Sequence, residues 1–118
     1  MAAKDAVGRH GEQVVARRLE EDGWEVLARN WRVARGEIDI VAVDGHAVVA
    51  VEVKTRRTDA CGSPLEAVTP AKVARLRALL AAWLRQQSRT FSDARIDVVA
   101  VTLPAAGAAQ LEHVRGVE

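Results

Sequence analysis

The segment from Gly36 to Arg57, which reads GEIDIVAVDGHAVVAVEVKTRR, constrains the fold more than any other part of the chain. It contains two runs rich in valine, isoleucine and alanine, Glu37–Val43 and Ala47–Lys54, joined by an Asp-Gly-His sequence at residues 44–46. An Asp-Gly pair between two apolar runs of this kind is typical of a tight β-hairpin. The segment therefore predicts two adjacent antiparallel strands.

Four charged residues interrupt these apolar runs: Glu37, Asp39, Glu52 and Lys54. Charged side chains on an apolar strand cost free energy unless they are paired, hydrated or bound to a cation. Side chains alternate between the two faces of a strand, so Glu37 shares a face with Asp39, and Glu52 shares a face with Lys54. Whether these two faces coincide depends on the register of the hairpin.

Two registers place all four charges on one face. If Val43 pairs with His46, Asp39 lies diagonal to Glu52. If Val43 pairs with Val48, Asp39 lies directly opposite Glu52. A loop of odd length without a bulge would separate the two carboxylates, because a slip of one residue turns every side chain of a strand to the other face.

Two carboxylates and an ammonium on one face make a site for a hard cation such as Mg²⁺ or Mn²⁺. A metal there would polarise a phosphoryl oxygen and lower the pKa of a bound water, and Lys54 would orient that water or stabilise charge on the phosphate. The structural alternative is an ion pair between Glu52 and Lys54, with Asp39 as a charge that protects a strand edge from aggregation. The added aspartate in strand register and the basic pair Arg56-Arg57 favour the metal site.

The order of an aspartate, a hairpin and then Glu-x-Lys resembles the PD-(D/E)xK nuclease superfamily. More narrowly, GEIDIVA followed by VEVKTR is similar to the YraN family, small bacterial proteins related to Holliday junction resolvases. The resemblance covers nearly the whole chain and extends to Gly8, Gly11-Glu12, Asn30, Lys72 and Arg95-Ile96-Asp97-Val98-Val99. Ile38 departs from the superfamily motif, which has proline at that position. The resemblance implies a restriction-endonuclease-like core, with Asp39, Glu52 and Lys54 as catalytic residues.

Glu12 belongs to a predicted amphipathic helix over Lys4–Asp22, where it lies beside the apolar stripe. From spacing alone, a glutamate at this position is more often solvated than functional. The related resolvases carry a helix glutamate as a further metal ligand, so the resemblance implies Glu12 as a third carboxylate of the site.

The remaining segments complete an α/β domain over residues 1–118. Periodicity and turn residues predict a strand at Trp24–Arg29, a basic loop at Asn30–Arg35, a polar loop at Thr55–Ser63, a helix from Thr69 to about Gln87, and strands at Ala94–Leu103 and Gln110–Val117. The element order is α-β-β-β-α-β-β. It predicts a mixed sheet flanked by two main helices and resembles the restriction-endonuclease-like core.

Charge and composition limit the ways in which this chain can bind nucleic acid. The net charge of the 118 residues is only +1, so a binding surface must come from local clusters. The candidates are Arg32 and Arg35 before the hairpin, Arg56 and Arg57 after it, and Lys72 in the first turn of the second helix. The chain has four aromatic residues and no tyrosine, which favours contact with the phosphate backbone over base stacking.

Other functional classes find little support in the sequence. Cys61 is the only cysteine, which excludes an internal disulfide and a cysteine zinc cluster, and its Gly/Ser/Pro surroundings predict a loop thiol. The N-terminus lacks the apolar run of a signal peptide, and no segment has the length of a membrane span. We therefore expect a cytoplasmic protein without a membrane partner.

Three functional hypotheses follow. The first is a Mg²⁺- or Mn²⁺-dependent endonuclease that hydrolyses phosphodiesters in DNA, including branched or structured DNA. The second is a nucleic-acid-binding protein of the same fold without cleavage activity. The third is a scaffold protein whose hairpin charges form a buried polar network. A resolvase-like reaction needs two active sites for opposing strands, which favours a homodimer.

Overall fold

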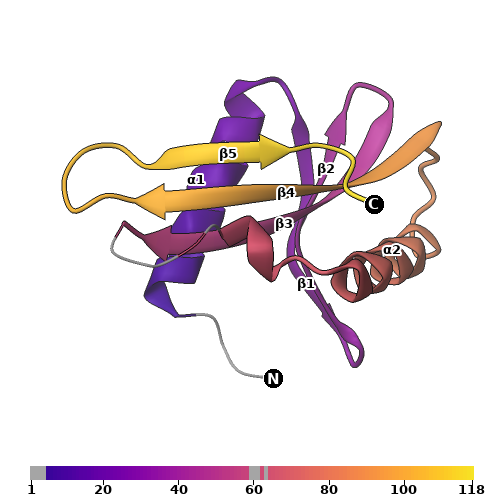
Figure 1. The fold of residues 1–118 in the computed structure, drawn as a ribbon. Helices are drawn as coiled ribbons and strands as arrows, with labels where there is room; N and C mark the ends of the chain where they lie inside the picture. The colour runs from indigo at the N-terminus through magenta and orange to yellow at the C-terminus, as the bar shows by residue number, and fades with distance from the viewer. Residues whose placement is uncertain (1–4, 59–61, 63) are drawn as a thin grey trace.

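The computed structural model describes residues 5–58, 62 and 64–118 of the chain. Its elements, in order, are α1 (Ala6–Glu21), β1 (Glu25–Val33), β2 (Gly36–Asp44), β3 (Ala47–Arg57), a short 3₁₀ helix η1 (Pro64–Ala67), α2 (Pro70–Leu84), β4 (Asp93–Leu103) and β5 (Gln110–Val114) (Figure 1). The predicted α/β class and the order α-β-β-β-α-β-β are confirmed. No helix in the described ranges is both long and apolar enough to cross a membrane.

The five strands form one mixed sheet in the order β1-β2-β3-β4-β5. Three neighbouring pairs are antiparallel, and β3 pairs with β4 in parallel. A parallel pair needs a crossover connection, and here that connection carries α2. The central strand β3 therefore contacts both the hairpin partner that precedes it and the strand that follows the crossover.

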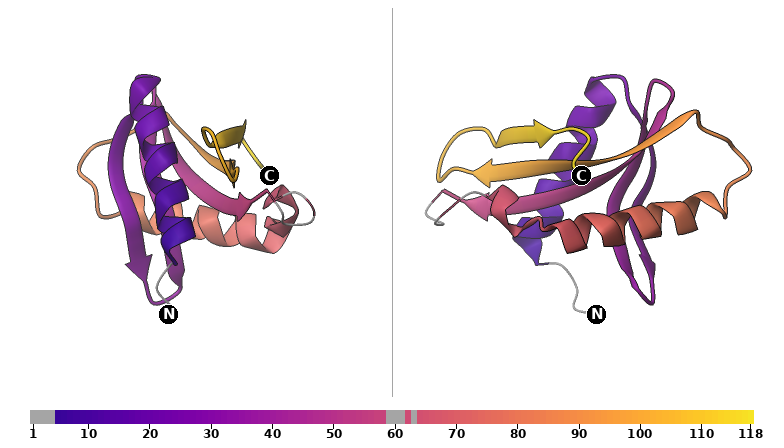
Figure 2. Two further views of the ribbon diagram at one scale, coloured as in Figure 1. Left: turned by 90° about the vertical axis from the view of Figure 1, so that its left-hand side faces the viewer. Right: turned by 45° about the vertical axis from the view of Figure 1, so that its right-hand side comes forward.

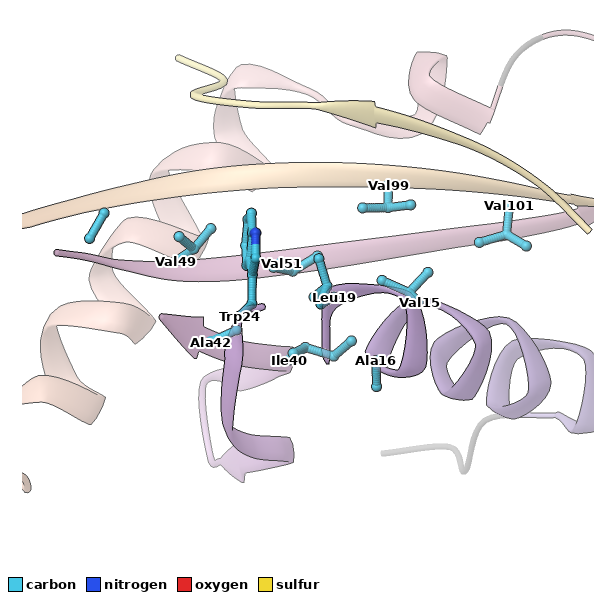
Figure 3. Close-up of a cluster of buried hydrophobic side chains, with 11 residues drawn as sticks. Val15, Ala16, Leu19, Trp24, Ile40, Ala42, Val49, Val51, Val99 and Val101 are labelled. Carbon is cyan, nitrogen blue, oxygen red and sulfur yellow. The ribbon is translucent and has the colours of Figure 1, made fainter. Parts of the chain in front are cut away.

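The two helices cover opposite faces of the sheet, as Figure 2 shows. The face under α1 is filled by small and branched apolar residues, among them Val15, Ala16, Leu19, Ile40, Val51, Val99 and Val101 (Figure 3). The face under α2 is filled by Val41, Val48, Ala50 and Ile96 of the sheet and by Leu76, Leu79, Leu80 and Trp83 of the helix. Each helix begins at a capping residue, Asp5 for α1 and Thr69 for α2.

The central hairpin adopts the second of the two registers. Val43 pairs with Val48 and Asp44 with Ala47, so that the turn consists of Gly45 and His46. Gly45 has φ of 61°, the left-handed conformation that tight hairpin turns require. In this register the positions beyond the last pair, Ile40 with Val51, are those of Asp39 and Glu52.

Four predicted boundaries are wrong, among them the end of α2, which lies at Leu84 rather than near Gln87. Residues 30–33, expected in a basic loop, continue β1, because Arg32 and Val33 pair with Glu37 and Gly36 of β2. Residues 55–57, expected in a polar loop, continue β3, because they pair in parallel with residues 101–103 of β4. The last strand ends at Val114, three residues early. The predicted loop position of Cys61 lies outside the described residues.

Candidate functional site

The site lies where the β2–β3 hairpin stops pairing through its main chain. Beyond Ile40 and Val51 the ladder ends, and the main-chain amide of Val53 donates to Asp39 Oδ2 at 2.8 Å. The carboxylate of Asp39 thus takes the place of a main-chain acceptor. Asp39 is thereby held against β3 directly beside Glu52.

A change in strand orientation accompanies this opening. Ile38 packs in the cluster under α2, whereas Ile40, two residues later, packs in the cluster under α1. The facing β1 pairs are Trp31 with Ile38 and Arg29 with Ile40, and Asn30 between them has φ of 53°, which is uncommon for a residue other than glycine. The hairpin of β1 and β2 therefore turns at the level of Asp39.

Beside this opening is a pocket of about 300 Å³ between β2, β3 and α2. Its walls combine acidic residues of the hairpin with basic and apolar residues of β3 and α2: Gly36, Glu37, Asp39, Glu52, Val53, Lys54, Lys72, Arg75, Leu76 and Leu79. All four charged residues that the sequence singled out in the hairpin line this one pocket. The structure thus brings these four side chains together at one pocket, and the change in strand orientation at Asp39 is part of how it does so.

Asp39 and Glu52 place two negative charges in a nearly dry environment. Asp39 is 4% exposed and Glu52 is 6% exposed. Burial raises the pKa of the Glu52 carboxyl, and the negative charge of Asp39 raises it further. The fold therefore holds two carboxylates together against their repulsion, which is the arrangement that a bound cation would relieve.

Two lysines supply positive charge to the same oxygen of Glu52. The ammonium of Lys72 lies 2.6 Å from Glu52 Oε2, and that of Lys54 lies 3.7 Å from it. Burial lowers the pKa of Lys54, and the neighbouring charge of Lys72 lowers it further. Burial acts to lower the pKa of Lys72, but its hydrogen bond to Glu52 and the negative charges of Glu52 and Asp39 together outweigh burial, and the pKa is raised.

Glu12 is buried, with only 1% of its surface exposed, rather than solvated as spacing alone suggested. Its carboxylate lies 4.0 Å from Nη2 of Arg29, and Glu12 is not among the residues that line the pocket. Across residues 5–58, 62 and 64–118, no three acidic, histidine or cysteine side chains converge on a common point. The structure thus brings together two of the three predicted metal ligands.

The predicted nucleic-acid contacts are distributed unevenly around the pocket. Lys72 lines it, and Arg32 pairs at 3.0 Å with Glu37, which lines it too. Arg35, Arg56 and Arg57 are not among its lining residues.

Sequence reasoning missed Arg75, an exposed residue of α2 that lines the pocket. The signal was present, because residues three apart on a helix share a face and Arg75 follows Lys72 at that spacing.

The donor set fits a small hard divalent cation. Mg²⁺ is usually held by one or two carboxylates, with the remaining positions taken by water and substrate phosphate. Asp39 and Glu52 supply such a carboxylate pair, and the pocket leaves room for the other ligands. The close approach of an ammonium to Glu52 shows that this position attracts positive charge.

A larger hollow of about 410 Å³ lies between the second half of α2, the start of β4 and residues 116–118. Its polar groups have structural partners. Arg95 donates to both Asp97 and Asp44, and Arg77 donates to the carbonyl oxygen of Val117. The Arg77 bond fastens the residues after β5 to α2, and the Arg95 bonds join β4 to the end of β2.

Comparison with known proteins places the chain among its relatives. The model of UPF0102, an uncharacterised protein family, matches residues 11–101. A UPF0102 protein of Beutenbergia cavernae is 56% identical over 99% of both chains, and one of Kineococcus radiotolerans is 55% identical over 98% of this chain and 95% of its own. One of an Arthrobacter species is 50% identical over 99% of both chains. The YraN-like resemblance is thereby confirmed at the level of the family, and the chain belongs to UPF0102.

Proposed function

We propose that this protein is a metal-dependent endonuclease that hydrolyses phosphodiester bonds in DNA. The observation that carries the proposal is the buried pair of carboxylates, Asp39 and Glu52, facing two lysines in one pocket. The resemblance of the same residues to the PD-(D/E)xK pattern supports it.

Each residue of the pocket would have a separate role in such a reaction. Asp39, fixed by the Val53 amide, and Glu52 would hold the cation. A bound Mg²⁺ or Mn²⁺ supplies a water of lowered pKa and positive charge against the phosphate. Lys54 projects into the pocket beside Glu52, where its ammonium would donate to the attacking water or to a phosphate oxygen. Glu12 would join as a third ligand only if its carboxylate turned away from Arg29.

The substrate would be held through its backbone. Lys72 and Arg75 lie at the pocket, while Arg32, Arg35, Arg56 and Arg57 would extend the contact along neighbouring phosphates. Cleavage of opposing strands in branched DNA would require two such sites, so we also propose a homodimer. Size-exclusion chromatography with light scattering measures that directly.

The test is a cleavage panel of linear, flapped and four-way DNA in Mg²⁺ or Mn²⁺, with wild type beside Asp39→Asn. The amide is a poor ligand for Mg²⁺, so the variant should lose about a thousandfold or more in rate, roughly 4 kcal/mol of barrier. Metal-free DNA affinity should hold steady or rise, because one negative charge leaves the pocket. Cleavage that survives the substitution would assign the activity elsewhere.

A second candidate is a DNA-binding protein that does not cleave. The observation that favours it is the ammonium of Lys72 at 2.6 Å from Glu52, which already neutralises the acidic pair without a metal. In that case wild type would retain DNA in chelator and cleave no substrate in either metal.

A further inference from the structure

We propose that Lys72 acts as a built-in cation that competes with the divalent metal for Glu52 and turns to the substrate phosphate once the metal has displaced it. The inference rests on the proposed metal site. It adds to that site a switch between a closed state, in which the protein neutralises its own carboxylates, and an open state loaded with metal.

The first turn of α2 is an unfavourable place for the positive charge of Lys72, and the contact with Glu52 is what offsets this. Thr69 caps the helix, Pro70 is its first residue and Lys72 is the third, within the first turn. A helix N-terminus carries partial positive charge, which disfavours a cation there. The ammonium nevertheless approaches Glu52 Oε2 more closely than that of Lys54 does. The acidic pair is thus what holds this side chain in the pocket.

A bound metal ion and the ammonium of Lys72 would occupy overlapping positions at the carboxylate of Glu52. A cation ligated by Asp39 and Glu52 must contact a Glu52 oxygen, and the bound ammonium lies against Oε2. A metal ion and an ammonium that both contact the carboxylate of Glu52 would lie close together, and two positive charges repel each other strongly in a pocket of reduced dielectric. Binding of the metal therefore requires the ammonium to leave.

Lys72 can leave without disturbing the fold. Its main-chain amide donates to Thr69 Oγ1 at 3.2 Å, so the helix start is held independently of the side chain. The side chain is already 30% exposed, and its flexible four-carbon stem can carry the ammonium outward. Arg75 lies one turn further along the same face of α2 and lines the same pocket. The released ammonium would join it as a contact for phosphate.

The test measures Mn²⁺ binding by titration calorimetry, with no DNA present, for wild type, Lys72→Gln and Arg75→Gln. Both variants remove one positive charge from the pocket wall, but only Lys72 contacts Glu52. If Lys72 competes directly, Lys72→Gln should bind Mn²⁺ roughly fivefold to tenfold more tightly than wild type, which corresponds to about 1 to 1.4 kcal/mol. Arg75→Gln should change the affinity much less.

Thermal unfolding provides a second readout that does not depend on activity. Without metal, Lys72→Gln should melt below wild type, because Glu52 loses the nearer of its two lysine partners and keeps only Lys54. Saturating Mn²⁺ should raise the melting temperature of Lys72→Gln more than that of wild type, since a ligand that binds the folded state more tightly stabilises it more.

The outcomes separate the two proposals. Equal, measurable Mn²⁺ affinity in wild type and Lys72→Gln would overturn competition by Lys72 and leave the metal site standing. Equal tightening in both variants would also overturn it, because that result needs only general electrostatics. Absence of Mn²⁺ binding in all three proteins would overturn the metal site itself, and the switch with it.

Discussion

Asp97 shows how strongly one residue can organise a buried polar network. It is fully buried, and it accepts from Arg95 Nε at 3.0 Å, from His113 Nε2 at 2.9 Å and from the amide of Gly116 at 3.0 Å. Burial acts to raise its pKa, but these hydrogen bonds outweigh burial and hold the pKa below its ordinary value of 3.8. The network joins β4 to β5 and to the residues after β5.

Replacing Asp97 with asparagine should therefore destabilise the protein by about 3 kcal/mol, since it leaves buried donors without their charged partner. Urea unfolding at neutral pH measures the loss. Glu112→Gln, an exposed carboxylate on β5, is the matched control and should stay within about 0.5 kcal/mol of wild type. An Asp97→Asn protein as stable as wild type would show that the network carries no net stability.

The same residue gives the protein a dependence on acid. Because the pKa of Asp97 is lower in the folded state, its contribution is complete above pH 3.8 and is lost as the pH falls below that value. The raised pKa of Glu52 acts in the opposite sense, because it costs stability as the pH rises above 4.5. The difference between wild type and Asp97→Asn should therefore shrink in unfolding measured from pH 6 down to pH 3.

At the level of elements, the contact of α1 with β3 depends on Gly11. A Cβ at this position would overlap Thr55 Oγ1 and would lie 2.8 Å from Thr55 Cγ2 and 2.9 Å from Thr55 Cβ. The helix therefore approaches the strand more closely than any residue with a side chain permits.

Gly11→Ala should force α1 away from the sheet and destabilise the protein by about 1 to 3 kcal/mol, despite the better helix propensity of alanine. Thermal unfolding measures this. Gln13→Ala, on the exposed side of the same helix, is the control for a substitution to alanine in α1 that meets no neighbour and should change the stability little. Adding Thr55→Ala to Gly11→Ala should recover part of the loss, because it removes two of the three crowded atoms. No recovery would locate the strain elsewhere.

The hairpin could be predicted from the sequence because its signals are local. Alternation of apolar residues and the Asp-Gly pair at the turn predicted the hairpin and left its register open between two even loops, which bring Asp39 near Glu52, and an odd loop, which separates them. The continuation of β1 was missed because Asn30 interrupts the pattern, although Trp31 and Val33 still alternate. The burial of Glu12 depends on how closely α1 approaches β3, and the periodicity of a helix does not determine its distance from a neighbouring strand.

Lys72 illustrates a different limit. Sequence reasoning placed it in the first turn of a helix beside nucleic acid, but its contact with Glu52 joins segments twenty residues apart. Such a contact follows from the crossover that carries α2 from β3 to β4. Neither local propensity nor spacing specifies how far that helix extends over the hairpin.

For the whole molecule, a net charge of +1 means that DNA affinity must come from a few local cations. Arg35 is exposed in the turn between Val33 of β1 and Gly36 of β2. The end of this hairpin protrudes from the molecule in Figure 1. Arg35→Ala should weaken DNA binding and reduce the slope of log affinity against log salt by about 0.9, the value for one phosphate contact. Fluorescence anisotropy across a salt series measures both.

Arg17→Ala provides the matched control for that measurement. Arg17 is exposed on α1, which covers the face of the sheet opposite α2. Its loss removes the same charge from the molecule without touching the proposed binding face. An equal effect of both substitutions would mean that DNA binding follows net charge rather than this surface.

The topology of the sheet also sets the order in which the pocket is assembled during folding. The β2–β3 hairpin has a turn of only two residues, and hairpins of this kind form within about 1–10 microseconds. The parallel pair of β3 and β4 forms more slowly, because the connection of residues 58–92 must first bring the two strands together. We expect Asp39 and Glu52 to meet while both are still hydrated, and pulsed hydrogen exchange that protects β3 and β4 simultaneously would contradict this. Docking of α2 then covers the two carboxylates and delivers Lys72 in the same step, so the chain desolvates its acidic pair only as a second cation joins Lys54 beside Glu52.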